Sequence, residues 1–270
     1  MTPAGKCSLP EFLCPRRKAT AFAPGLCHNG RKGGIFMKRA YLRKLTAAAL
    51  LAALLLSPVL AAEELHPAYL GGFPDGSIRP ESTLTREQLA QALYRLIPEA
   101  QRTELTAPVC FSDVPQSRWS SEAVTAMVNL GVLYGTGDGA FCPEAAVTAP
   151  ELAAALMRAA ASETARACLP ELAAGWDAQS FCFETGGGWV MGLEGTVFLP
   201  EQPLTRGRFA EILNGILGRT PQSLESLLVG MPLWSDNLDT QAPYFLALQE
   251  AGTTHTAERL DSGEQWTGLG

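Results

Sequence analysis

Beyond residue 62 the sequence contains no lysine, and arginine supplies all eleven of its basic residues. Ten of the chain's 21 basic residues lie before residue 63, whereas only one of its 27 acidic residues, Glu11, does. The part from residue 63 onward therefore has a net charge near −15. A field of this sign repels nucleic acid and anionic lipid surfaces, so an acidic ligand must be held by a local group of arginines. Arginine suits that task, because its planar fork binds carboxylates in a bidentate manner.

Catalytic signatures are also lacking from this part. It has two histidines, His66 and His255, which would approach each other only if the two ends of the chain met. Two histidines without a third ligand make a weak metal site, so the sequence predicts no metal and no cofactor. No Gly-rich phosphate loop, Cys-x-x-Cys pair or Ser-His-Asp order is present. We therefore expect a protein that is not an enzyme.

The first 62 residues have the character of a targeting region. Basic residues in the segment 37–44 precede an apolar run over 45–56, and small residues follow near Ala61. This order is typical of a secretory signal peptide over residues 37–62, and the run is short for a membrane span. An uncleaved anchor is the alternative. We expect the upstream extension, residues 1–36, to be disordered or not translated.

One unit of sequence occurs three times between residues 71 and 213. Each copy has a glycine-rich turn, an apolar residue, a proline, and a threonine five positions later that precedes an apolar helix. Constant spacing inside the units and variable spacing between them is typical of an array whose units are stable only against their neighbours. The proline and threonine pairs are Pro80 and Thr85, Pro143 and Thr148, and Pro200 and Thr205.

Local residue chemistry predicts how each unit is built. Each threonine is placed to cap the helix that follows it, because its hydroxyl can accept a hydrogen bond from an N–H of the first turn. The two Asp-Gly pairs predict tight turns in which glycine takes a positive φ and the aspartate bonds nearby backbone. The turn residues are Asp75, Gly76, Asp138 and Gly139, and the apolar residues expected in the core are Ile78, Phe141 and Phe198.

Another half-unit precedes the turn. The segment 111–114 leads through Trp119 to an apolar helix over 121–130, and the segment 234–236 opens a last copy with no turn after it. The chain thus starts with the second half of a unit and ends with the first half of another. These two halves could complete each other in space and close three full units.

The combined pattern, F-S-D-V, W, a helix, G-V-L-x-G, D-G-x-F-x-P and T-R, resembles the S-layer homology module over roughly residues 66–255. The resemblance implies a mainly α fold of three helix-loop-helix modules in a pseudo-threefold arrangement. It also implies a secreted protein held at the bacterial cell wall or cell surface. Its partner would be secondary cell-wall polysaccharide, acidic and often pyruvylated, bound in grooves between modules, with no nucleic acid and no membrane after signal cleavage.

We expect the modules to follow the repeats. The predicted organisation is residues 63–109 as the second half of module 1, 110–163 as module 2, 164–220 as a degenerate module 3, 221–255 as a terminal half-module and 256–270 as a polar tail.

Two arginines are the leading candidates for ionic contacts with such a glycan. The family's threonine-arginine motif maps onto Arg86 in the first copy and Arg206 in the third, while the middle copy has Ala149. The alternative is that neither arginine contacts a ligand, and that each lies in the first turn of its helix, exposed or paired with a carboxylate.

Three further residues match the family pattern. Asp113 and Asp236 match an aspartate that borders the groove or orders the loop before the first helix, with a helix-approach cap as the alternative role. Trp119 matches an aromatic residue that either stacks on a sugar face or fills the core.

Two questions stay open at the level of sequence. A secreted scaffold that keeps the fold without binding glycan, with a surface protein as its partner, is the alternative function. A glycan groove should show clustered arginines, whereas a scaffold should distribute them. The cysteines form two disulfides or stay unpaired, and beyond residue 62 they are Cys110, Cys142, Cys168 and Cys182.

Overall fold

The computed structural model describes residues 63–105, 107–178, 189–190, 197–198, 202–260 and 263–270. The predicted signal peptide and the upstream extension lie outside the described residues. The described residues belong to one compact unit that extends to Gly270.

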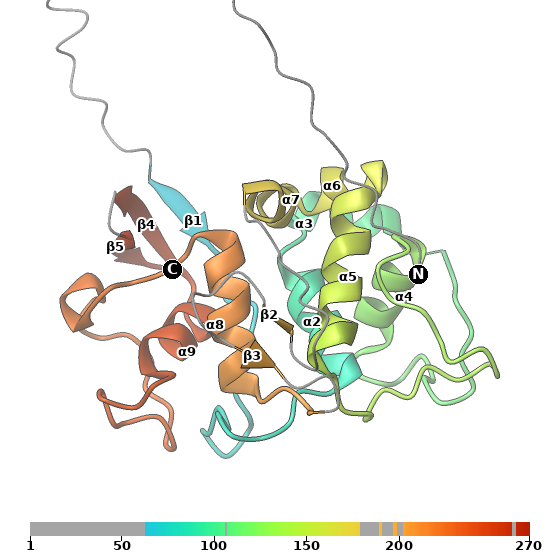
Figure 1. Ribbon diagram of the computed structural model, residues 1–270, viewed down its shortest axis with the longest axis horizontal. Coiled ribbons are helices and arrows are strands. Elements are labelled where there is room, and N and C mark those ends of the chain that lie inside the picture. Colours follow the sequence, from blue (N-terminus) through green and yellow to red (C-terminus); the bar gives the residue numbers. More distant parts are fainter. Residues whose placement is uncertain (1–62, 106, 179–188, 191–196, 199–201, 261–262) are drawn as a thin grey trace, which may run out of the picture. The chain divides into compact units, whose positions relative to one another are not determined.

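Helices predominate, as the sequence predicts, and short strands accompany them (Figure 1). The helices are α2 (Arg86–Arg95), α3 (Glu99–Arg102), α4 (Ser121–Asn129), α5 (Ala149–Ala161), α6 (Glu163–Cys168), α7 (Pro170–Ala178), α8 (Arg206–Leu217) and α9 (Phe245–Gly252), with 3-10 turns η1 (Thr103–Leu105) and η2 (Leu224–Ser226). The strands are β1 (Glu64–His66), β2 (Trp189–Val190), β3 (Val197–Phe198), β4 (His255–Leu260) and β5 (Gly263–Leu269).

Threonine caps begin the three long helices. The Thr85 hydroxyl accepts from the backbone N–H of Gln88, whose side chain accepts from the Thr85 N–H, so a capping box starts α2. A second box starts α5 at Thr148, and Thr205 caps α8 by accepting from the N–H of Arg208 at 3.2 Å. These bonds satisfy N–H groups that no helical carbonyl can reach.

The residues just before the three caps are hydrogen-bonded in a closed ring. Leu84 N–H donates to the Leu204 carbonyl at 2.8 Å, Leu204 N–H donates to Val147 at 2.8 Å, and Val147 N–H donates back to Leu84 at 2.9 Å. All three side chains are buried. The three copies of the repeat therefore meet at equivalent backbone positions.

The two ends of the described chain lie against each other. Strand β1 pairs antiparallel with β4, and the N–H groups of Tyr69 and Leu70 both donate to the carbonyl of Ala251 in α9. Figure 1 shows β1 beside β4, with α9 beneath α8. The opening and closing half-units of the sequence thus contact each other directly.

Residues 256–270 differ from the polar tail expected from the sequence. They form most of a β-hairpin, β4 and β5, which completes a three-stranded sheet of order β1-β4-β5. Ala257 and Trp266 point inward and pack with Leu227 and Phe245 in a small second core. The alternation of buried and exposed positions in this short segment is the strand signal, which its many polar residues obscure.

The main core confirms the inward placement of Ile78 and Phe141, which are fully buried. The side chain of Phe198 lies outside the described part of the structure. Cys110, Cys142 and Cys168 carry free thiols, and Cys182 is not among the described residues. No helix in the described ranges is long and apolar enough to cross a bilayer.

Candidate functional site: a groove beside Trp119

The Asp-Gly turns have the geometry that the sequence predicts. Gly76 has φ of 79° and Gly139 has φ of 87°. Asp75 accepts from the Ser77 N–H at 3.0 Å, and Asp138 accepts from the Ala140 N–H at 3.1 Å. Hydrogen bonds from Ser77 and Arg79 hold the pKa of Asp75 well below its usual range.

Asp113 and Asp236 each secure the end of one such turn. The Asp113 carboxylate accepts from the N–H groups of Phe141 and Cys142 at 2.9 and 2.7 Å. Asp236 does the same for Ile78 and Arg79, at 2.8 Å each. Burial opposes ionisation of Asp113, but the two backbone bonds outweigh it and lower its pKa.

The residues held by these carboxylates have strained backbones. Arg79 and Cys142, which occupy the same place in their repeats, are the non-glycine residues with positive φ in the described chain, at 55° and 57°. A left-handed conformation costs roughly 1–2 kcal/mol for such residues. Asp113 and Asp236 therefore bond the turn loops of the repeats, whereas the sequence led us to expect them at the groove or in the loop before the first helix.

Arg86 and Arg206 are tied to the same loops. Arg86 donates from Nε to the Phe141 carbonyl at 2.9 Å and from Nη2 to the Tyr134 carbonyl at 2.6 Å. Arg206 donates to the carbonyls of Ile78 and Gly71 at 2.8 and 2.7 Å.

Burial distinguishes the two arginines. Arg206 is 2% exposed, and burial together with the charge of Arg79 lowers its pKa to about 10. Arg86 is only partly buried and lies over the Phe141 ring. Both guanidinium groups thus brace turn loops through backbone carbonyls, and Arg206 also borders a groove described below.

Trp119 is presented to solvent by the residues on either side of it. Arg118 binds both oxygens of Glu87 at 2.8 and 2.9 Å, and the Ser120 hydroxyl donates to the same carboxylate at 2.6 Å. Hydrogen bonds to Glu87 and Glu144 raise the pKa of Arg118 above its usual range. With its neighbours clamped to α2, the Trp119 side chain stays 58% exposed, so it does not fill the core.

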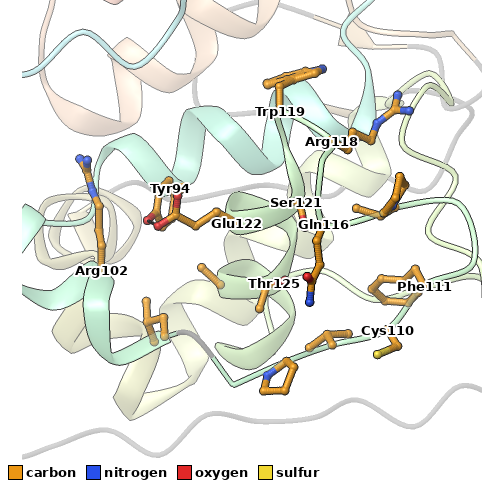
Figure 2. A pocket seen from close by; sticks show the side chains of 16 residues that line it. Tyr94, Arg102, Cys110, Phe111, Gln116, Arg118, Trp119, Ser121, Glu122 and Thr125 are labelled. Atoms are coloured by element: carbon orange, nitrogen blue, oxygen red, sulfur yellow. Dashed lines mark hydrogen bonds between the residues drawn. The ribbon is translucent and has the colours of Figure 1, made fainter.

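Trp119 lies on the rim of two hollows. The first, of about 560 Å³, lies between α2, α4 and the segment 108–119 (Figure 2). Figure 2 shows the Trp119 ring extending away from the Tyr94 and Glu122 side chains, which are hydrogen-bonded at 2.6 Å. Its two arginines are already engaged, because Arg102 donates to backbone carbonyls and Arg118 to carboxylates.

The second hollow, which we call the Trp119 groove, has about 470 Å³ and a different chemistry. Its walls are the loop 69–74, one face of α2, Trp119 and Arg206. Gln88, Gln91 and Arg95 project from α2 at positions i, i+3 and i+7, which share one helical face. The groove therefore combines an exposed indole, two amides and the guanidinium groups of Arg95 and Arg206, and the Glu87 carboxylate, which is bonded to Arg118 and Ser120, also lines it.

Arg95 is the distinctive member of this groove. All eleven arginines beyond residue 62 are described, and ten of them donate a hydrogen bond to a described protein group. The Arg95 guanidinium has no such bond to any residue that the structure describes, although it lies against Gly71. Burial and the charge of Arg102 lower its pKa. A half-buried cation without a partner is suited to an anionic ligand.

The repeat pattern marks Gln88 only as a partner of the Thr85 cap and does not mark Gln91 or Arg95. The polar stripe on one face of α2, Gln88, Gln91 and Arg95, was the available signal.

A separate cluster has the donor set of a metal centre. His66, Glu250, His255 and Glu264 are all buried, with one donor atom of each within 4.8 Å of the others. The sequence predicted no metal site because it offered only two histidines. The closure of the chain ends brings them together, with ring centroids 5.1 Å apart, and adds two carboxylates from α9 and β5.

Comparison with known proteins finds one matching family and two curated relatives. Residues 69–90 and 111–148 match the S-layer homology domain family. The chain is 27% identical over 169 residues to Cell surface glycoprotein 1 of Acetivibrio thermocellus, an alignment that covers 58% of this chain and 7% of that protein. It is 22% identical over 209 residues to the Cellulosome-anchoring protein of the same organism, covering 73% and 47% respectively. No solved structure matches the chain.

These matches show S-layer homology sequence in two segments of the chain and support a secreted, cell-surface location. The chain spans less than half the length of either curated relative.

Proposed function

We propose that the chain attaches non-catalytically to the bacterial cell wall by binding secondary cell-wall polysaccharide in the Trp119 groove. The S-layer homology match and the two surface-protein relatives support attachment to the wall. The observation that carries the choice of groove is Arg95, the arginine without a protein partner among the described residues, in the same groove as an exposed tryptophan.

Each wall of the groove suits one part of an acidic sugar. The Trp119 ring offers a flat apolar face on which the C–H groups of a pyranose can stack. Gln88 and Gln91 can each donate to and accept from hydroxyl groups. Arg95 can bind a carboxylate, such as that of a pyruvyl ketal, through two parallel hydrogen bonds.

In this proposal Arg86 and Arg206 act mainly as braces. Each guanidinium spends two donors on backbone carbonyls of a turn loop. Arg206 holds Gly71, which forms part of the groove wall, so it positions the loop and borders the ligand. Asp236 accepts from the N–H groups of Ile78 and Arg79, next to the Ile78 carbonyl that Arg206 binds.

We further propose that the three repeats are modules arranged with pseudo-threefold symmetry and bounded as the sequence predicts. The closed ring of hydrogen bonds among Leu84, Val147 and Leu204 supports this arrangement. The equivalent contacts of Arg86 and Arg206 also support it. The backbone N–H groups of Arg86 and of the next residue donate to Ala145 and Pro143 of the second copy, and those of Arg206 and the next residue donate to Ser82 and Pro80 of the first copy. The middle copy lacks these contacts in part. Ala149 replaces the arginine, and Pro150, at the next position, has no backbone N–H to donate.

A protein partner is the second candidate function, and a different surface favours it. Val229, Leu233 and Leu238 are exposed by 103%, 58% and 60% in the segment that precedes α9. A group of exposed apolar side chains is typical of an interaction site. This surface shares no residue with the Trp119 groove, so the two candidates can be tested separately.

Co-sedimentation with cell walls tests the proposal. The chain from Glu63 to Gly270 is incubated with walls of the source bacterium before and after the secondary polysaccharide is stripped. We expect binding that is lost on stripping and weakened at least tenfold by Arg95→Ala and by Trp119→Ala, since each removes a contact of about 1.5 kcal/mol or more. Arg208→Ala is the matched control, because Arg208 pairs with Glu211 on α8 outside the groove.

Two results would reject the proposal. Equal binding to stripped and intact walls would exclude the polysaccharide as the ligand. Normal binding by the Arg95 and Trp119 variants would exclude this groove. Loss of binding in a variant of Val229 or Leu233 alone would direct the search to a protein partner.

A further inference from the structure

Four buried side chains from the two ends of the chain converge in one place. His66 comes from β1, Glu250 from α9, His255 from β4 and Glu264 from β5. His66 Nδ1 lies 3.3 Å from Glu250 Oε1 and 3.5 Å from Glu264 Oε2. His255 Nε2 lies 3.0 Å from Glu250 Oε2 and 3.9 Å from Glu264 Oε1. None of the four residues is more than 1% exposed.

Hydrogen bonds within the protein leave this cluster poorly satisfied. Both ring nitrogens of His66, both carboxylate oxygens of Glu264 and Oε1 of Glu250 are buried without a hydrogen-bond partner among the described residues. Each unsatisfied buried polar group costs about 1–3 kcal/mol, and more when it is charged. With both imidazoles neutral, as a metal requires of its histidine ligands, the two buried carboxylates would leave an uncompensated charge of about −2. A divalent cation would balance this charge and give the unpaired atoms a partner.

The distances fit a tetrahedral divalent ion. Zinc binds imidazole nitrogen and carboxylate oxygen at about 2.0–2.2 Å, which places neighbouring ligand atoms roughly 3.3–3.5 Å apart. The four histidine–carboxylate distances given above range from 3.0 to 3.9 Å, counted over both oxygens of each glutamate. With one donor atom from each residue, all four lie within 4.8 Å of one another, so a bound zinc ion would draw them slightly closer. Two nitrogen and two oxygen ligands, all inaccessible to water, match a closed structural site better than a catalytic one.

The surroundings orient the donors. His255 Nδ1 lies 2.9 Å from the Thr253 carbonyl, which can accept the Nδ1 proton. In the neutral ring that bond leaves Nε2, which faces Glu250 Oε2 at 3.0 Å, as the nitrogen that would bind a metal. Trp266 donates from Nε1 to Glu250 Oε2 at 2.9 Å and stacks on the His255 ring with centroids 3.9 Å apart. Such outer contacts are the usual support of metal ligands.

We propose that these four side chains form a structural zinc site that fastens the first strand of the chain to its last helix and hairpin. The ligands are separated by up to 198 positions in the sequence, between His66 and Glu264. A metal that joins them stabilises the contact between the opening and closing half-units. It acts as a clasp and contacts no part of the Trp119 groove.

The first test is metal binding by the chain from Glu63 to Gly270, produced without a histidine tag and freed of metal by a chelator. We expect one zinc ion per chain by elemental analysis after dialysis, and a visible absorption band of tetrahedral type when cobalt(II) replaces zinc. Zinc at a thousandfold excess over its dissociation constant should raise the melting temperature by about 10 °C. The apo protein should melt at the lower temperature again after chelation.

Two ligand variants and one control identify the site. His255→Gln and Glu264→Gln should lose the zinc ion and the thermal shift. Glu264→Gln removes a buried, unpaired carboxylate, so its metal-free form should melt no lower than the metal-free wild type. Glu258→Gln is the control, because Glu258 lies on β4 with His255 but outside the cluster. This variant should keep both the zinc ion and the thermal shift.

The outcomes separate zinc from an ordinary ion pair. If the cluster is only an ion-paired network, the wild type will bind no zinc and show no thermal shift, which would overturn the proposal. Zinc that persists in both ligand variants would place the metal elsewhere and overturn it as well. If a variant fails to fold, the zinc content and cobalt spectrum of the wild type decide alone.

Discussion

Replacing Asp236 by alanine should unfasten the turn loop of the first repeat from the last half-unit. The Asp236 carboxylate accepts two backbone hydrogen bonds, from Ile78 and Arg79, across 158 and 157 positions of sequence. Hydrogen bonds to a charged group contribute about 1.5–3 kcal/mol each when buried, and less when exposed to water. Because Asp236 is exposed, we expect the pair to contribute about 2 kcal/mol in total.

The assay is urea unfolding followed by circular dichroism, together with amide hydrogen exchange. A loss of about 2 kcal/mol corresponds to a fall in melting temperature of roughly 4–8 °C for a chain of this size. Exchange should become faster at the amides of Ile78 and Arg79, which lose their acceptor. Asp113→Ala should behave in the same way at Phe141 and Cys142, because the two carboxylates have equivalent partners.

Asp239→Ala is the control, since the Asp239 side chain accepts only from the nearby N–H of Gln241 in the described structure. Its effect should stay within about 0.5 kcal/mol. A loss below this value for Asp236→Ala, or unchanged exchange at Ile78 and Arg79, would refute the assigned role.

Three further predictions concern the same framework. Arg206→Lys should destabilise the chain by about 2–3 kcal/mol in urea unfolding, because an ammonium cannot reach both carbonyls that the buried guanidinium binds; an unchanged midpoint would contradict the bracing role. Cys142→Gly should raise stability by up to about 1 kcal/mol, since glycine relieves the left-handed strain at φ of 57°; a fall would show that the thiol packs favourably. The pKa of Asp113 is lowered in the folded state, so its contribution is complete above its unfolded pKa of about 3.9 and is lost as pH falls below it. The gap in unfolding free energy between the wild type and Asp113→Ala should therefore shrink between pH 6 and pH 3, and a constant gap would exclude this linkage.

The local chemistry of the repeats was predictable because it is written in consecutive residues. Caps such as Thr85 and turns such as Asp75-Gly76 depend on side chains that bond their own backbone within four positions. The equivalence of Arg79 and Cys142 also follows from alignment of the copies, although their shared positive φ does not. A glycine at these positions would have indicated a positive φ from the sequence, but arginine and cysteine do not.

The hydrogen-bond partners of the arginine side chains could not be predicted from the sequence in the same way. The motif marks Arg86 and Arg206 as important, but either a ligand or a carbonyl can satisfy a guanidinium. The choice depends on which loop lies within reach after folding. Arg95 has no motif, and its significance arises only because the described structure offers it no acceptor.

The hairpin and the histidine cluster required tertiary information. His66 and His255 lie 189 positions apart, and Glu250 and Glu264 are two of the 26 acidic residues beyond residue 62, with no motif around them. Their approach depends on pairing between β1 and β4, in which His66 is directly opposite His255. A register shift of one residue would turn one histidine to the other face of the sheet.

The distribution of arginines would allow so acidic a chain to hold the acidic ligand that we propose. Its overall field repels anions, but the Debye length at physiological salt is only about 8 Å, so local groups decide binding at contact. Among the described residues, ten arginines are spent on protein carbonyls and carboxylates, which rigidify loops and helix ends. That rigidity keeps the wall at Gly71 in place against Arg95, whose charge stays available. Gly71→Ala should therefore impair glycan binding while sparing stability, because the added methyl would lie 3.1 Å from Nη1 of Arg95 and displace it; unchanged binding with a displaced Arg95 would mean that the guanidinium does not contact the ligand.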